Sequence, residues 1–205
     1  MSHPAPALNG PSLMLLIRHG ETTWAAQGRH TGRTDIELTE AGRDQSRRLG
    51  AIIERLLDGR GQPVVFTSPL ARARDTAALA MPRVEATETD LLFEVDYGQY
   101  EGLTGEEIGE RHPGWSVFAD GCPGGESVAA VAARCDSFIA KAERMAPGRP
   151  VVAFSHGHLS RALTARVLGL PVPGAGAFYN DTATIAVFDH RKGVLVLTGW
   201  NLSAG

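Results

Sequence analysis

The chain alternates short, continuously apolar runs with longer amphipathic stretches, and this alternation limits the folds open to it. The runs Leu13–Ile17, Val64–Thr67 and Pro150–Phe154 are short and lack polar alternation, which is typical of strands buried on both faces. Apolar residues at helical spacing predict helices over 39–57, 70–80, 126–145 and 158–168. Strands that alternate with helices predict an α/β fold, a three-layer α/β/α sandwich around a mostly parallel sheet.

The last two β-rich runs, Thr182–Asp189 and Val194–Thr198, are joined by a tight turn. Such a connection predicts an antiparallel hairpin at one edge of the sheet. With 205 residues, the chain has the length of one domain, which we expect over 12–205 after a disordered leader over 1–11. Within that domain, residues 83–125 carry glycine, proline and aromatic residues without sustained periodicity. We expect an irregular segment there that covers the substrate, with a short helix near Thr104–Arg111.

The charge balance argues against a polyanionic partner. Twenty Lys and Arg residues face 23 Asp and Glu residues, a net charge of −3, so we expect neither nucleic acid nor an anionic membrane surface as partner. Only Lys141 and Lys192 are lysines, and the other 18 cations are arginines. Genomic base composition explains most of this excess, but a few arginines are suited to bind an oxyanion because the guanidinium group is a rigid fork of donors.

Neither the cysteines nor the apolar runs suggest a secreted or membrane protein. Cys122 and Cys135 cannot build a disulfide framework, and Cys135 falls on the apolar stripe of the helix predicted over 126–145. No apolar run approaches the roughly 20 residues of a membrane span. We therefore expect a cytoplasmic protein with reduced thiols.

Two of the predicted strands end in a histidine followed by a glycine. Arg18-His19-Gly20 follows the first strand and Ser155-His156-Gly157 follows the last parallel one. Another strand is followed by a helix that carries Arg72 in its first turn. Ligands of open α/β sheets bind beyond the carboxyl ends of the strands, where these side chains converge. Two arginines and two histidines predict a pocket for a phosphate dianion.

Six sequence blocks occur in the order of one known family: Leu16–Thr22, Gly28–Gly32, Leu38–Gly42, Thr67–Ala73, Glu94–Gly102 and Ser155–Gly157. Together they resemble the histidine phosphatase superfamily, the phosphoglycerate-mutase-like group, over residues 13 to about 170. A single Arg-His-Gly tripeptide would be a weak signal, whereas six ordered blocks are specific.

The resemblance implies a role for each matching residue. His19 would attack the phosphoryl group as a neutral imidazole. Arg18, Arg72 and His156 would hold the phosphoryl oxygens in the transition state. Glu94 would protonate the leaving oxygen and later take a proton from water, which requires a partly desolvated site near the phosphate. The family chemistry needs no metal ion or other cofactor.

Several glycine and threonine residues complete the expected phosphate and substrate site. Gly20 and Gly157 would contribute backbone N–H groups beside the two histidines. Thr31 and Gly32 would lie at the substrate mouth, although a purely structural role in their loop is an equal alternative.

Some of these assignments have competitors. Glu94 has rivals in Glu88, Asp96 and Glu101, and its choice depends on the alignment of motifs. His158 is expected to point away from the site as a helix-start residue. A zinc site at His156 and His158 is disfavoured because no third ligand lies at suitable spacing.

The phosphatase branch of the family fits better than the mutases. Only about thirty residues separate Glu94 from the Pro123–Glu126 block, the chain stops soon after Asn201, and Ala25 stands where the mutases usually carry asparagine. The resemblance thus implies a phosphatase that hydrolyses small phosphorylated metabolites such as sugar phosphates. A cofactor-dependent phosphoglycerate mutase and a non-catalytic phosphate sensor are the alternatives. The oligomeric state is left open, a homodimer included.

Overall fold

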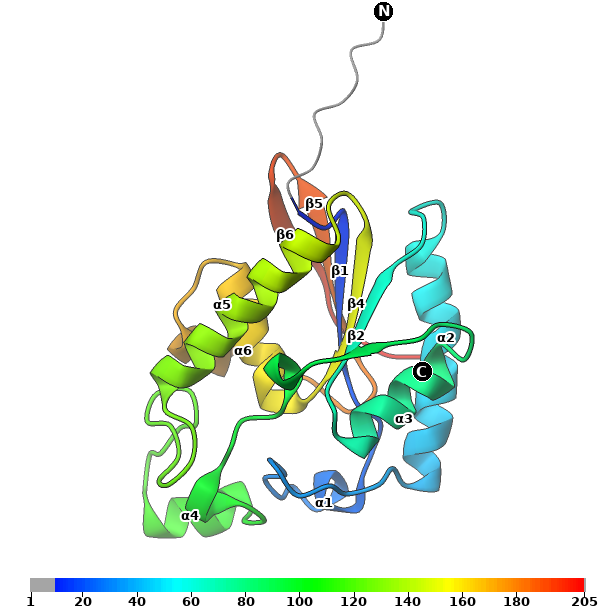
Figure 1. The fold of residues 1–205 in the computed structure, drawn as a ribbon. Coiled ribbons are helices and arrows are strands. Elements are labelled where there is room, and N and C mark those ends of the chain that lie inside the picture. The colour runs from blue at the N-terminus through cyan, green and yellow to red at the C-terminus, as the bar shows by residue number, and fades with distance from the viewer. Residues whose placement is uncertain (1–9, 205) are drawn as a thin grey trace, which may run out of the picture.

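The computed structural model describes residues 10–204, in which a six-stranded mixed sheet lies between two layers of helices (Figure 1). The strands are β1 (Leu13–Arg18), β2 (Val64–Thr67), β3 (Thr87–Glu88), β4 (Pro150–Ser155), β5 (Ile185–Arg191) and β6 (Val194–Leu202). The α-helices are α1 (Thr23–Ala26), α2 (Glu40–Leu57), α3 (Ala71–Ala80), α4 (Gly105–Arg111), α5 (Val128–Met145) and α6 (Gly157–Val167). Three 3₁₀ turns complete them: η1 (Asp90–Leu92), η2 (Gly98–Tyr100) and η3 (Val172–Ala177).

The strand order is β3-β2-β4-β1-β5-β6. β1 pairs in parallel with β4 and in antiparallel orientation with β5, and β2 pairs in parallel with both β4 and β3. β5 and β6 form an antiparallel pair, with β6 at the edge. The predicted α/β fold, the mostly parallel sheet and the antiparallel edge hairpin are thereby confirmed.

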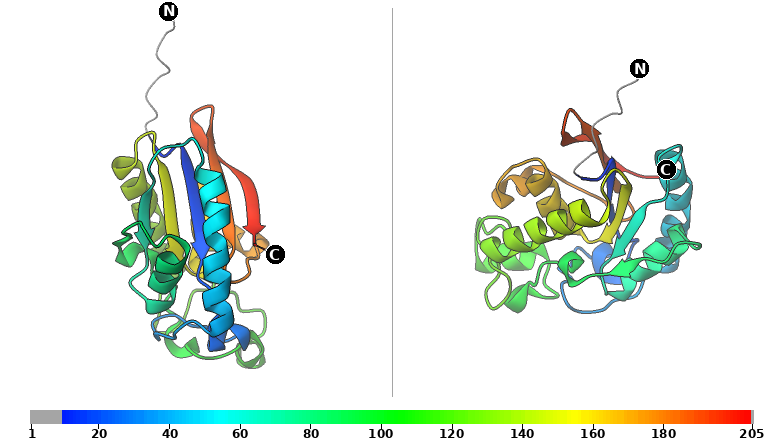
Figure 2. Two further views of the ribbon diagram at one scale, coloured as in Figure 1. Left: turned by 90° about the vertical axis from the view of Figure 1, so that its right-hand side faces the viewer. Right: turned by 45° about the horizontal axis from the view of Figure 1, so that its top comes forward.

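The continuous apolar run of β1 reflects burial on both faces of the sheet. Met14 and Leu16 belong to the core cluster that includes Phe138 of α5, whereas Leu15 and Ile17 belong to a second cluster with α2 and α3. α5 and α6 cover one face of the sheet, and α2 and α3 cover the other, as Figure 1 and the two further views of Figure 2 show. A central strand between two helix layers has no solvent face, so polar alternation would leave buried polar side chains without partners.

Local capping sets where the main helices begin. The Thr39 hydroxyl accepts a hydrogen bond from the Gly42 amide at the start of α2, and Ser127 caps α5 in the same way. Thr104 and Glu107 form a reciprocal capping box at the start of α4. The helix predicted near Thr104–Arg111 is therefore present.

Residues 83–125 contain only short elements, namely β3, η1, η2 and α4. β3 is an edge strand of the sheet, whereas α4 and α1 lie at the lower end of Figure 1, beyond the carboxyl ends of the parallel strands. Of the leader predicted over 1–11, residues 1–9 lie outside the described residues; the carbonyl of Gly10 accepts a hydrogen bond from the amide of Gly148. None of the helices in residues 10–204 is long and apolar enough to cross a lipid bilayer.

Candidate active site

A cavity of about 360 Å³ opens beyond the carboxyl ends of β1 and β4. Its walls come from the end of β1, the loop over 25–31, the segment around Glu94 and Tyr97, the first turns of α6, and the loop before β5. Segments far apart in the sequence therefore meet at the edge of the sheet where the sequence predicted a phosphate site.

His19 lies at the end of β1 with 4% of its surface exposed and lines the cavity. Its Nδ1 lies 2.7 Å from the carbonyl oxygen of Gly20, which can only accept a hydrogen bond, so Nδ1 carries the proton. The unprotonated Nε2 is then free to act as a nucleophile. Burial, followed by the positive charges of Arg72 and Arg18, lowers the pKa of His19 well below its usual value. His19 is thus a neutral imidazole with a fixed tautomer.

The absence of a side chain at Gly20 lets the backbone just after β1 pass close to α2. A Cβ at Gly20 would overlap the carbonyl of Gly42 and lie 2.7 Å from the Ser46 hydroxyl. The Gly20 amide donates to the Thr76 hydroxyl at 3.0 Å rather than into the cavity, which Gly20 does not line. Its contribution is therefore the close approach of the backbone and not an N–H for phosphate.

Arg18 lines the cavity and has hydrogen-bond donors that the protein itself does not use. Its Nη1 donates to the carbonyl of Asn180 at 2.8 Å, and its buried Nε has no hydrogen-bond partner among the described residues. Gly157 makes room for this side chain, because a Cβ there would lie 3.3 Å from the Arg18 Cζ. The Nη2 of Arg18 likewise has no partner among the described residues and is the donor left for an anion in the cavity.

Arg72 is completely buried and lies behind the cavity wall. Its Nη1 donates to the carbonyl of Thr34 at 2.9 Å, and its Nη2 donates to the carbonyls of Thr31 and Gly32 at 3.0 Å each. These bonds hold the loop over 31–34, leaving one Nη1 proton without a partner among the described residues. Arg72 therefore has a structural duty that the sequence did not reveal.

His156 is also fully buried and does not line the cavity, although its ring centroid lies 5.2 Å from that of His19. Nε of Arg72 donates to its Nδ1 at 3.1 Å, so Nε2 carries the proton and donates to the Ser68 hydroxyl at 2.8 Å. Both ring nitrogens are engaged by the protein. His156 can contact a phosphoryl oxygen only if one of these bonds is exchanged.

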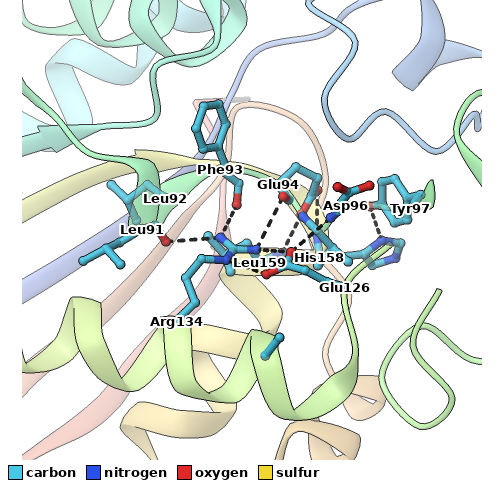
Figure 3. Close-up of polar contacts among 12 residues, drawn as sticks. Leu91, Leu92, Phe93, Glu94, Asp96, Tyr97, Glu126, Arg134, His158 and Leu159 are labelled. Atoms are coloured by element: carbon cyan, nitrogen blue, oxygen red, sulfur yellow. Dashed lines mark hydrogen bonds and ion pairs between the residues drawn. The ribbon is translucent and has the colours of Figure 1, made fainter. Parts of the chain in front are cut away.

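Among residues 10–204, Glu94 is the one carboxylate that lines the cavity, and it is 4% exposed. Its oxygens accept hydrogen bonds from the amides of Val95, His158 and Leu159 at 2.8 to 3.0 Å (Figure 3). Two of those donors belong to the first turn of α6, where the helix dipole favours negative charge. The carboxyl group is thereby held at the N-terminus of α6, where His156 and Gly157 also lie.

The three rival carboxylates have other contacts. Glu88 is exposed and lies 3.7 Å from the equally exposed Arg74. Asp96 accepts from the Gly98 amide, outside the cavity lining. Glu101 accepts from the amide of Gly32 at 2.9 and 3.0 Å, and a Cβ at Gly32 would lie 2.6 Å from that carboxylate. Gly32 is therefore a loop residue, and of the two mouth positions only Thr31 lines the cavity.

The segment that carries Glu94 is clamped by Arg134 of α5, which sequence reasoning missed. Arg134 donates to the carbonyls of Leu91 and Phe93 at 3.2 and 2.6 Å (Figure 3). It also forms a two-fold contact with the carboxylate of Glu126 at 2.6 and 2.8 Å. Glu126 in turn accepts from the Asp96 amide at 3.0 Å. The apolar periodicity of the sequence could not reveal the pair of Arg134 and Glu126, because both residues bind backbone groups of a distant irregular segment.

Replacement of Arg134 by glutamine is expected to lower the free energy of unfolding by about 3 kcal/mol, because it leaves the Glu126 carboxylate unpaired in a largely buried place. Arg166→Gln is the matched control, since Arg166 contacts Asp136 with the same two-fold geometry at the exposed surface. We expect the control to cost less than about 1 kcal/mol. Urea unfolding measures both, and equal losses would contradict this account of the clamp.

Two further histidines lie at the cavity, contrary to the expectation that His158 points away. His158 and His30 both line it, with ring centroids 5.4 Å apart. The Tyr97 hydroxyl lies 2.6 Å from Nδ1 of His158, which turns the ring inward from the first turn of α6. The Nδ1 of His30 lies 2.9 Å from the carbonyl of Leu103. The expectation for His158 was wrong because a tertiary contact sets its side-chain direction.

Four imidazoles of the site share one electrostatic property. Burial is the largest cause that lowers the pKa of His19, His30, His156 and His158 below the usual value for histidine. The unfolded chain takes up these protons near pH 6.5, whereas the folded protein takes them up only at lower pH. The stability that they provide is complete above about pH 6.5 and is lost as the pH falls.

The urea midpoint is accordingly expected to fall between pH 7 and pH 5.5, since each such imidazole contributes up to about 1.4 kcal/mol per pH unit. Removal of one of these groups in His30→Gln should make the decline shallower. A midpoint that stays constant over this range would show that the pKa of these imidazoles is not lowered in the folded protein.

Among residues 10–204, no group of three or more His, Cys, Asp or Glu side chains is arranged to hold a metal ion. Cys135 is fully buried in α5, and burial raises the pKa of its thiol to about 12. Neither observation adds a ligand or a thiolate to the site.

Comparison with known proteins gives a consistent picture. Residues 14–203 match the family described as the histidine phosphatase superfamily (branch 1). An acid phosphatase of Mycobacterium tuberculosis is 46% identical over 192 residues, covering 91% of this chain and 93% of that protein. A sedoheptulose 1,7-bisphosphatase of Saccharomyces cerevisiae is 32% identical, covering 77% and 68%. A solved structure of an open reading frame from Mycobacterium tuberculosis superimposes with a TM-score of 0.89 at 43% identity, covering 94% and 98%.

Proposed function

Because this chain belongs to branch 1 of the histidine phosphatase superfamily, we propose that it hydrolyses small-molecule phosphomonoesters through a phosphohistidine on His19. The observation that carries the proposal is the state of His19: a buried, neutral imidazole whose Nδ1 is bonded to a carbonyl and whose Nε2 is free at the cavity. That is the state in which an imidazole attacks phosphorus.

In the first step, Nε2 of His19 forms a bond to phosphorus while the ester P–O bond breaks. Glu94, in its protonated form, gives its proton to the departing oxygen, which leaves as an alcohol. The three amide contacts fix the position of the Glu94 carboxyl group at the cavity.

In the second step, water attacks the phosphorus of the phosphohistidine and the P–N bond breaks. Glu94 takes a proton from this water, which returns the carboxyl group to its starting state, and His19 recovers its lone pair. Inorganic phosphate is the product.

Arg18 is the main group available to the phosphoryl oxygens, since its Nη2 has no hydrogen-bond partner among the described residues. Arg72 is buried behind the cavity wall, so its remaining Nη1 proton would reach a phosphoryl oxygen only if the loop over 31–34 moved. His156 and the other donors of Arg72 then act chiefly by holding the site in shape, a smaller direct role than the motifs suggest. No metal ion is needed, because the guanidinium groups supply the positive charge.

The cavity supports a phosphatase over a mutase. Ala25 lines it at the position where the mutases usually carry asparagine, so one polar group is absent from the wall. A volume of about 360 Å³ suits a small metabolite.

The test is to mix the protein with a phosphomonoester, quench in base, and look for phosphate that is stable to alkali and labile to acid on His19. Steady release of inorganic phosphate is the expected companion result. Net interconversion of phosphoglycerates that needs a bisphosphoglycerate primer would instead favour the mutase. Tight phosphate binding without turnover across a broad substrate panel would favour a sensor.

A further inference from the structure

One arginine at the cavity has no assigned duty in phosphoryl transfer. Arg161 lies in α6, four residues after Gly157, and lines the cavity beside Tyr179 and Asn180. In an α-helix, four residues advance on the order of 6 Å along the axis. Arg161 is therefore one turn away from the helix terminus that faces the phosphoryl site.

The contacts of Arg161 leave its charge uncompensated. Its Nε and Nη2 donate to the carbonyls of Ala175 and Gly176 at 3.3 and 3.4 Å, both long bonds. Its guanidinium carbon lies 4.6 Å from the ring centroid of Phe118. Among the described residues it forms no ion pair. Burial lowers the pKa of Arg161, which reflects the cost of holding this charge away from water.

Among the described residues, cations outnumber anions in the lining of the cavity. Arg18, Arg29 and Arg161 line it, against the single carboxylate of Glu94, which is already held by three amides. Arg29 lies 3.5 Å from Glu107 and is partly compensated. A phosphate bonded to His19 would engage Arg18, which leaves Arg161 as the cation without an anion.

We propose that Arg161 binds a second anionic group, carboxylate or phosphate, on the leaving-group part of the substrate. The inference rests on the proposed function and narrows it: the preferred substrates are small phosphomonoesters that carry a second acidic group a few bonds from the ester. A guanidinium resting on an aromatic ring keeps its plane fixed, which suits the two-fold contact that either oxyanion offers. Arg161 is a specificity residue here and takes no part in bond breaking.

Two matched substrate pairs test this. One is 3-phosphoglycerate against glycerol 3-phosphate, which differ in a carboxylate; the other is 1,3-propanediol bisphosphate against its monophosphate. In at least one pair we expect the wild-type protein to prefer the acidic member by about tenfold or more in kcat/KM, mainly through KM. Arg161→Gln should reduce that preference about tenfold, toward equality. Loss in the first pair identifies a carboxylate as the ligand, and loss in the second identifies a phosphate.

Arg166→Gln on the same helix is the control, because Arg166 contacts Asp136 at the surface and does not line the cavity. It should keep the wild-type preference. If Arg161→Gln does not fold, Arg161→Lys replaces it as the test. Lysine keeps the positive charge but cannot make the two-fold contact, so the preference for the acidic substrate should still fall severalfold.

Retention of the full preference in the folded Arg161 variant, or a wild-type protein with no preference in either pair, overturns the inference. In both cases His19-dependent phosphate release would persist, and the proposed function would stand. Absence of His19-dependent release from every substrate would instead overturn the proposed function itself.

Discussion

Replacement of His19 by alanine is expected to lower kcat for phosphate release by about 10⁴-fold or more, because the group that forms the bond to phosphorus is gone. Arg18 would still bind phosphate, so product inhibition should survive the substitution. The measurement is steady-state phosphate release, together with the base-quenched search for covalent phosphate, which should find none.

His190→Ala provides the control, since His190 lies in β5 and does not line the cavity. It should retain wild-type turnover. Thermal unfolding of the His19 variant excludes simple loss of the fold, for His19 is itself buried. A folded His19→Ala protein with normal turnover would refute the phosphohistidine mechanism.

Glu94→Gln is expected to lower kcat for alkyl phosphates by about 10²- to 10⁴-fold, because it removes the proton donor and the base together. A phenolic leaving group such as that of p-nitrophenyl phosphate departs without protonation, so its loss should be smaller in the first step. Water activation still needs Glu94, and phosphohistidine should therefore accumulate with this substrate. The measurement compares kcat for both substrate types with the amount of base-stable phosphoenzyme.

Glutamine also lacks one of the two acceptor oxygens that bind the amides of α6, so some stability should be lost. Glu88→Gln is the control, as Glu88 is exposed and lies on β3. Equal loss for alkyl and phenolic esters without phosphoenzyme would mean that Glu94 only holds the helix terminus.

The fold and the location of the site followed from patterns within the sequence. Apolar runs such as that of β1 predicted buried strands, and helical stripes predicted α2 and α5 to within two residues of their ends. The ordered motifs identified the family, which the match over residues 14–203 confirms. Parallel topology then places the ends of β1 and β4 side by side, so His19 and His156 had to meet.

Hydrogen-bond partners at the site could not be predicted in the same way. Arg72 uses most of its donors on the loop over 31–34, Arg134 clamps the segment before Glu94, and Tyr97 turns His158 into the cavity. In each case, the partner is tens of residues away and is often a backbone carbonyl. Because every residue has a carbonyl, the sequence contains no mark of which one is bound.

The sequence by itself therefore determined the main strands and helices, the two-sided core and the edge of the sheet at which the site lies. These depend on side-chain polarity at regular spacing and on the chain direction of neighbouring strands. Only the tertiary structure decided which donors remain free for a ligand, Arg18 and Arg161 among them, and which are used within the protein. A free donor is what remains after every local contact has formed, and those contacts exist only in the folded chain.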